Sequence, residues 1–248
     1  MTRMLSTVFV AAIALHAISV ACQVVAQAPA DAPTAKSAKP LSAQRLHLTP
    51  KPMAPPRVKV VFEGEPTPLV RDWAQEAAQL VIEWWPQVAR LLATEDFVPP
   101  DELALVFRRE LKAPALRTRE GIFVSIPWIT AHPDDFGMLV HELTHAIQDY
   151  HDVPRDAGWL VEGIADYVRY WHYEPEVERP RFDPSKAHYR DGYGTCASFL
   201  AWLVAHHDRR VVRKLDAALR SGQYSDAMFA EITSVELDTL WQRFLATR

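Results

Sequence analysis

The chain has 248 residues, of which 49% are hydrophobic and 23% are charged, which is enough for one sizeable domain with a packed core. Residues 1–28 carry one charge, at Arg3, and residues 29–57 carry five basic side chains against Asp31 alone. The remaining residues 58–248 have 21 basic against 30 acidic side chains, a net charge of −9 with no basic stripe. This acidic body argues against nucleic acid or an anionic membrane as the main partner.

The first 28 residues have the plan of a secretory signal peptide. Arg3 is followed by an apolar run over residues 5–21 and then by Ala26-Gln27-Ala28, which fits a small-x-small cleavage site. A membrane anchor is one alternative, because the run approaches the ~18–20 residues that a spanning helix needs. The cleavage site favours export and removal, so we expect a secreted or periplasmic protein without a stable membrane span.

A lipid anchor is the second alternative for this end of the chain. Ser19-Val20-Ala21-Cys22 resembles a bacterial lipoprotein box with Cys22 as the lipidated residue, although Ser19 stands where Leu is usual. Lipidation would hold the protein on the cell envelope. The other cysteine, Cys196, lies in an apolar helical pattern that predicts a small buried side chain and not a reactive nucleophile.

The folded domain begins after a proline-rich segment. Residues 29–57 contain seven prolines among mostly small and polar residues, a composition that cannot bury enough surface to offset its ordering entropy. We therefore predict a linker over 29–57 and a single domain over 58–248.

Short strands come first in this domain and helices follow. Apolar and β-branched residues predict strands at 58–62, 103–107 and 122–126, and helical spacing predicts a helix over 69–92 that Pro86 could bend or break. Further helices are predicted at 134–150, 158–171, 192–206, 209–219 and 235–246. A small mixed sheet followed by a mainly helical part indicates an α+β fold.

The first helix after the strands carries the HExxH motif His141-Glu142-Leu143-Thr144-His145. Residues four apart share a helix face, so both imidazoles can reach one ion, and imidazole is a good ligand of Zn²⁺. Glu142 lies about 100° round the helix, where its carboxylate could accept a proton from bound water. A chance pair of histidines on a solvated face is the alternative that this motif alone leaves open.

The next helix offers a third ligand. Glu162 and Asp166 are four residues apart among apolar neighbours, where carboxylates are costly unless they are paired or bound to metal. A catalytic zinc site needs three protein ligands and an open position. We therefore assign Glu162 as the third ligand, and Asp166 as the residue that hydrogen-bonds the distal nitrogen of a liganding histidine.

His151 is a competing third ligand. It stands six residues after His145, where the metzincin pattern HExxHxxGxxH has its last histidine. That pattern needs a glycine at which the chain leaves the helix abruptly, and this chain has Gln148 there. We favour Glu162 for this reason.

The motifs resemble those of known peptidases. HELTHAIQDY (residues 141–150) resembles the zinc helix of thermolysin-type gluzincins, and Glu162 with Asp166 is similar to their ExxxD. Together with GWLVEGIADYVRY (158–170) and DGYGTCASFLAWL (191–203), the sequence more closely resembles the basic secretory protein family, plant and bacterial proteins inferred to be peptidases. The resemblance runs from about residue 58 to the C-terminus and implies a zincin-like fold, secretion, and peptide or protein substrates.

The zincin resemblance also implies an edge strand and an oxyanion donor. The segment 122–126 would be the edge strand that pairs with an extended peptide. Tyr193, between two glycines, is our candidate for the group that hydrogen-bonds the oxyanion, and a cleft-wall aromatic is its alternative role. Tyr189 and His188 are weaker candidates.

These features predict a secreted zinc-dependent metallopeptidase, in which His141, His145 and Glu162 bind Zn²⁺ and Glu142 is the general base. A catalytically inactive binding protein with the zincin fold is one alternative, against which the intact Glu142 and the complete ligand set argue. An envelope lipoprotein with a structural role is the other alternative.

Overall fold

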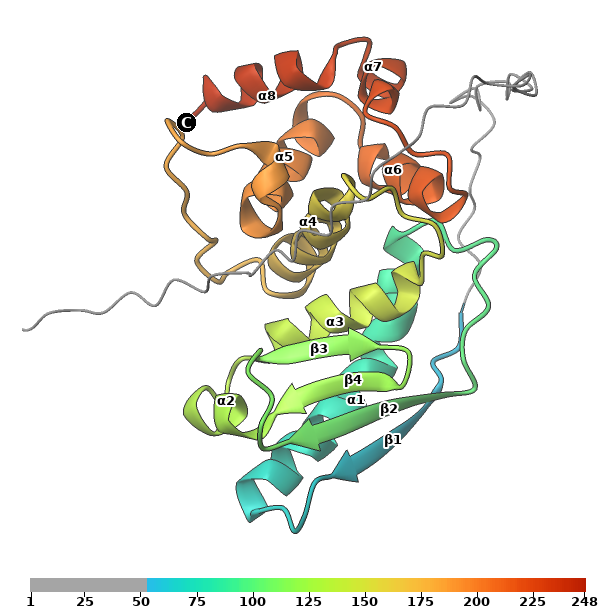
Figure 1. The fold of residues 1–248 in the computed structure, drawn as a ribbon, viewed down its shortest axis with the longest axis vertical. Helices are drawn as coiled ribbons and strands as arrows, with labels where there is room; N and C mark the ends of the chain where they lie inside the picture. Colours follow the sequence, from blue (N-terminus) through green and yellow to red (C-terminus); the bar gives the residue numbers. More distant parts are fainter. Residues whose placement is uncertain (1–52) are drawn as a thin grey trace, which may run out of the picture. The chain divides into compact units, whose positions relative to one another are not determined.

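The fold is seen in a computed structural model that describes residues 53–248 (Figure 1). The predicted signal peptide, the lipidation candidate Cys22 and most of the predicted linker lie outside these residues. Within the described part of the chain, no helix combines the length and the hydropathy that crossing a bilayer requires.

Four strands form one mixed sheet in the order β1-β2-β4-β3. The strands β1 (Arg57–Phe62), β2 (Glu102–Arg108) and β4 (Gly121–Ser125) run parallel, and β3 (Ala115–Thr118) pairs antiparallel with β4. Every predicted strand is therefore present. The sequence pattern missed β3, because four residues are too few to display an alternation.

The predicted edge strand was wrong. The segment 122–126 falls largely in β4, which lies inside the sheet and uses both of its hydrogen-bonding edges, toward β2 and toward β3. The sheet edge beside α3 is β3, and no strand of the described residues pairs with its outer side. Of the two edge strands, β1 and β3, the short β3 is therefore the one that lies beside α3.

Helix α1 (Pro68–Leu91) connects β1 to β2 and covers one face of the sheet (Figure 1). Thr67 caps its start, because the side-chain oxygen accepts the Val70 N–H. The helix continues through Pro86, since the carbonyl that Pro86 leaves unpaired belongs to Ile82 on the exposed side of the helix.

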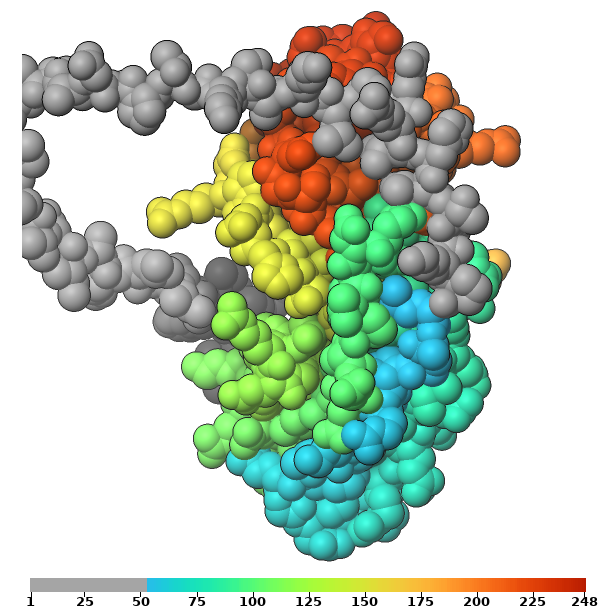
Figure 2. Space-filling view, turned by 90° about the vertical axis from the view of Figure 1, so that its right-hand side faces the viewer, coloured from blue at the N-terminus to red at the C-terminus, as the bar shows by residue number. Residues whose placement is uncertain are grey.

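The rest of the chain is helical, which confirms the predicted α+β class. All five helices predicted after the sheet are present, and the sequence pattern missed only two short ones, α2 and α7. In Figure 2 the residues coloured yellow, which belong to the chain around residue 150 where α3 ends and the chain leads into α4, lie between the blue-to-green sheet part and the orange-to-red C-terminal helices. The bounds are α2 (Ile126–Ala131), α3 (Gly137–Gln148), α4 (Gly158–Val168) continued by the π-helix η2 (Arg169–Tyr173), the 3₁₀-helix η3 (Tyr189–Asp191), α5 (Tyr193–His206), α6 (Val211–Arg220), α7 (Ala227–Thr233) and α8 (Leu237–Leu245).

Close packing of α4 on α5 positions the second site helix. Gly163 faces Cys196, and a β-carbon at Gly163 would lie 2.0 Å from the sulfur, so only glycine permits this approach. Cys196 is fully buried, as its apolar surroundings predict. This contact fixes the position of α4 against α5, and with it the position of Glu162 along α4.

Candidate metal centre

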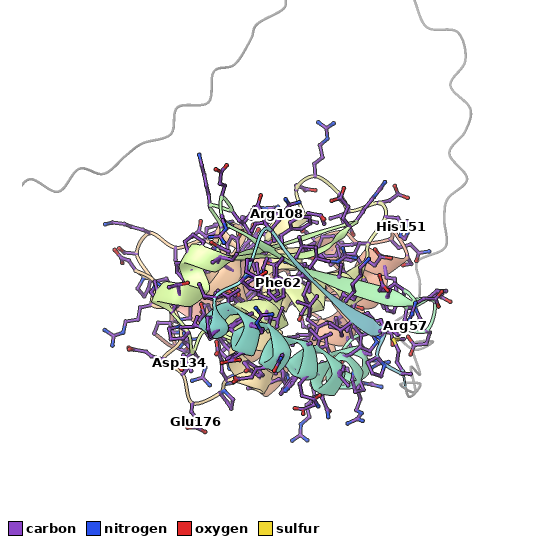
Figure 3. All side chains as sticks on the ribbon, turned by 90° about the horizontal axis from the view of Figure 1, so that it is seen from below. Arg57, Phe62, Arg108, Asp134, His151 and Glu176 are labelled. Carbon is purple, nitrogen blue, oxygen red and sulfur yellow. The ribbon has the colours of Figure 1, made fainter. Side chains whose placement is uncertain are left out.

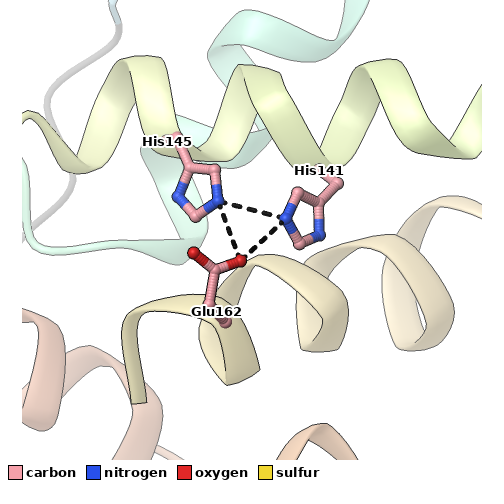
Figure 4. Close-up of side chains that lie close together, drawn as sticks. All are labelled: His141, His145 and Glu162. Carbon is pink, nitrogen blue, oxygen red and sulfur yellow. Dashed lines mark hydrogen bonds and ion pairs between the residues drawn. The ribbon is translucent and has the colours of Figure 1, made fainter. Parts of the chain in front are cut away.

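Three side chains from α3 and α4 converge on one point (Figure 4). The Nε2 atom of His141 lies 3.1 Å from Nε2 of His145 and 3.2 Å from Oε2 of Glu162, and the remaining pair is 3.4 Å apart. Donors bound tetrahedrally to Zn²⁺ at about 2.0–2.2 Å stand about 3.3 Å from one another, so this spacing fits that ion. Among residues 53–248 this is the one group of His, Cys, Asp and Glu side chains placed to hold a metal ion.

Asp166 orients the ring of His141. Its Oδ1 atom lies 2.7 Å from Nδ1 of His141, and both side chains are buried. A carboxylate only accepts a hydrogen bond, so Nδ1 must carry the proton. The lone pair of Nε2 is then directed at the shared point, the arrangement that metal binding requires.

Gln148 does the same for His145, and the sequence pattern did not assign it this role. Its Oε1 lies 2.7 Å from Nδ1 of His145, and its amide nitrogen donates to the carbonyl of Val161 on α4 at 3.1 Å. Because that carbonyl can only accept, the amide orientation is determined and Nδ1 of His145 must be the donor. Gln148 is 1% exposed. A polar residue three positions after a liganding histidine, on the same helix face, is the signal that could have identified it.

The electrostatics of the group favour a positive charge among the three donors. Burial opposes a charge on His141, but the hydrogen bonds to Asp166 and Glu162 outweigh it and raise the pKa of His141 to about 9. Burial likewise opposes a charge on Glu162, yet hydrogen bonds from both imidazoles lower the pKa of Glu162 to about 2. A cation bound between the three donors would take the place of the proton charge and interact with the same carboxylates, once the imidazoles are neutral.

Glu142 lies beside this group and is tied to the sheet. Its Oε2 atom accepts the backbone N–H of Arg117 in β3 at 2.6 Å. The register of β3 with β4 leaves this N–H on the outer edge of the sheet, which faces the cleft. The side chain expected to act as the base is thus held by a backbone group 25 residues earlier in the chain.

Tyr193 stands at the mouth of the cleft. It starts α5 with a positive φ of 42°, the residue is 57% exposed, and its ring lies nearly parallel to that of His141 with centroids 6.2 Å apart. The charge of Glu162, followed by burial, raises the pKa of Tyr193, so the phenol keeps its proton and can donate. This placement suits a group that contacts a bound substrate.

The other sequence candidates lie elsewhere. Tyr189 is buried and its hydroxyl donates to Asp238 at 2.9 Å, while His188 accepts the Arg190 N–H and caps η3. His151 is exposed in the loop after α3 and lies at the periphery of the molecule in Figure 3. Neither Tyr189 nor His188 lines the cleft, and His151 is not part of the three-donor group.

A cavity of about 570 Å³ opens beside the three donors. The outer edge of β3 and the preceding residues Ala113 and Pro114 form one wall, and α3 and α4 form the other. Glu142, Asp166 and Tyr193 also line it. The candidate ligands therefore face a space that is large enough for a segment of peptide.

Two histidines and a glutamate gathered at a cleft beside a further glutamate make this chain a candidate metalloenzyme. The family model described as peptidase of plants and bacteria (BSP) matches residues 115–244, more than half of the chain, and the chain belongs to this family. The match begins at β3 and includes every residue of the candidate site, and it confirms the resemblance indicated by the motifs. No curated protein and no solved structure matches the chain.

Proposed function

We propose that this protein is a secreted zinc-dependent metallopeptidase with a zincin-like fold. Membership of a peptidase family supports the reaction class. The observation that carries the metal dependence is the convergence of His141, His145 and Glu162, whose donor atoms lie 3.1–3.4 Å apart beside a cleft. His141, His145 and Glu162 would hold the ion, with Asp166 and Gln148 orienting the two imidazoles.

Each side chain around the cleft then has a distinct task. Zn²⁺ held by these residues would supply a Lewis acid that lowers the pKa of a water toward about 7 and polarises a carbonyl. Glu142 accepts a proton from the attacking water and delivers it to the leaving nitrogen. One of its oxygens is engaged by the Arg117 N–H, which leaves Oε1 to take the proton. The Tyr193 hydroxyl donates to the carbonyl oxygen as negative charge develops on it.

The peptide would lie along β3. An extended substrate can add to an exposed strand through main-chain hydrogen bonds, and β3 is the free edge beside the three donors. Alternate residues of a strand point their N–H and C=O groups to the same side. Ala115 therefore offers its N–H and C=O on the cleft side and Arg117 offers its C=O there, while the Arg117 N–H is taken by Glu142. We therefore propose β3, in place of the segment 122–126, as the edge strand that pairs with an extended peptide.

Metal analysis combined with a proteolysis assay tests the proposal. The purified exported protein should contain close to one zinc per chain and should cleave casein or a peptide library. Treatment with a chelator should abolish cleavage, and added Zn²⁺ should restore it. Zinc content without any cleavage would instead favour a binding protein, and cleavage that survives complete metal removal would exclude a metallopeptidase.

Secretion depends on residues 1–28 and needs a separate test. N-terminal sequencing of the exported protein should begin at Pro29. A lipidated N-terminus at Cys22, detected by labelled palmitate or by sensitivity of processing to globomycin, would place the protein on the cell envelope.

A further inference from the structure

A second, smaller hollow of about 270 Å³ extends the cleft past His145. Three residues, Arg117, His145 and Val161, line both this hollow and the larger cavity. The space beside β3 therefore continues on both sides of the candidate metal centre. A polypeptide bound along the strand would have room for side chains before and after the bond that is cleaved.

Two arginines line the larger cavity, and they differ in their partners. Arg169 is fully engaged, because its Nε donates to Glu174 at 2.5 Å and its Nη2 donates to Asp135 at 2.8 Å. Its charge is therefore already balanced by two carboxylates of the protein.

Arg117, in contrast, forms no ion pair with a carboxylate of the described residues. Among residues 53–248 no carboxylate oxygen lies within 4.0 Å of its guanidinium. Its one side-chain hydrogen bond goes to the Gly121 carbonyl at a long 3.4 Å, and its Nε is buried without a partner. Burial lowers the pKa of Arg117, although the more distant charges of Asp149 and Glu142 act to raise it. A partly buried cation with an unused donor and no ion pair is a suitable partner for an incoming anion.

We propose that Arg117 binds a carboxylate of the substrate, supplied by an Asp or Glu side chain close to the scissile bond. This inference rests on the proposed peptidase function. The planar guanidinium suits a carboxylate, which can accept two parallel hydrogen bonds from it. A free C-terminal carboxylate has the same chemistry, but the space on both sides of the metal centre favours a side chain within an extended peptide.

A binding experiment tests the inference without turnover. In zinc-loaded protein carrying Glu142→Gln, fluorescence anisotropy measures labelled, amidated, otherwise neutral peptides with one Glu scanned across the residues flanking the cleaved bond. A Gln series and a neutral peptide with a free C-terminus complete the set. We expect one Glu position to bind about tenfold more tightly than its Gln counterpart, the size of one charge-assisted pair.

The arginine variants identify the group responsible. Arg117→Gln should remove the Glu preference by weakening the Glu peptide alone, and Arg117→Lys should retain part of it. Lys112→Gln is the matched control, because it makes the same charge change at an exposed residue outside both hollows and should leave the preference intact. Zinc content and melting temperature report whether each variant is folded.

Each possible outcome supports or overturns the inference. A preference that is absent, or that survives Arg117→Gln in folded protein, overturns the inference. A gain confined to the peptide with a free C-terminus also overturns the inference, because the carboxylate would then come from the chain end and not from a side chain. If wild-type protein binds the Glu peptides but cleaves none, the proposed peptidase function fails while the role of Arg117 stands. If it cleaves peptides without any preference for Glu, the peptidase function stands and the role of Arg117 fails.

Discussion

The sheet and the helices contribute to the candidate site by different means. From the sheet come a cleft wall and one backbone group, the Arg117 N–H that holds Glu142. The helices α3 and α4 provide the three donor side chains and the two groups, Asp166 and Gln148, that orient the imidazoles. The expected metal ligands are thus held by neighbouring side chains of the helical part, whereas the expected base is held by the main chain of a distant strand.

The helical part also secures the end of α3. Arg220 of α6 donates to the carbonyls of Gln148 and Ile147 at 3.0 and 3.1 Å, where a helix C-terminus favours a cation. The fully buried Asp216 accepts from Arg220 at 3.4 Å and from the Tyr150 hydroxyl at 2.5 Å. Metal affinity should therefore depend mainly on the helices, and the rate of the chemical step should depend on both parts.

Removing a ligand should have the largest effect. Glu162→Ala leaves two of three donors, so we expect loss of most of the zinc and of all measurable hydrolysis, checked by metal analysis and a peptide assay. His151→Ala is the control and should keep both. Zinc retained in Glu162→Ala but released from His151→Ala would reverse the assignment of the third ligand.

Removing the base should separate chemistry from binding. Glu142→Gln should keep zinc, because Glu142 is not one of the three donors, and should lower kcat by at least about 100-fold. Steady-state kinetics and metal content on the same preparation measure the two effects. An unchanged rate would show that the activity comes from another site or from a contaminant.

Tyr193→Phe tests the group at the mouth of the cleft. It removes one oxygen and keeps the ring, so kcat should fall by roughly 10–10³-fold with KM little changed if the hydroxyl acts in the transition state. Zinc content and melting temperature should stay at wild-type values. A variant that keeps kcat would restrict Tyr193 to the role of a cleft-wall aromatic.

Gln148→Leu tests the support given by the helical part. Without the hydrogen bond to Nδ1, His145 loses its fixed orientation and tautomer, and zinc should bind about 10–100-fold more weakly. Competition with a chelator measures this affinity independently of catalysis. Gln148→Glu keeps an acceptor for Nδ1 but sets a carboxylate oxygen against the Val161 carbonyl, so it should recover only part of the affinity. Equal zinc affinity in Gln148→Leu and wild type would limit Gln148 to joining α3 and α4.

The smallest effect should come from the sheet. Arg117→Pro removes the N–H that holds Glu142, and an outward-facing position on an edge strand tolerates proline. Compared with Arg117→Gln, which keeps the N–H, we expect a further fall in kcat of about tenfold with zinc affinity unchanged. Identical kcat values for these two variants would show that the main-chain bond does not position the base.

Much of the site could be predicted from the sequence because its spacing is local. Positions four apart share a helix face, so the pairs His141 with His145 and Glu162 with Asp166 were predictable without knowledge of the packing. The α+β class followed from the order of apolar patterns along the chain, and the family resemblance from the same motifs. Burial of Cys196 was predictable for the same reason, since its neighbours are apolar.

Tertiary structure decided whatever depends on contacts between distant segments. Only the packing of α4 on α3 brings Val161 to Gln148, which determines the amide orientation and thereby the tautomer of His145. Sheet order made β3 the free edge and placed Arg117 beside Glu142, an outcome that four residues with no clear alternation cannot reveal. Periodicity assigns a side chain to a face of its own helix or strand, but which partner that face meets depends on long-range packing.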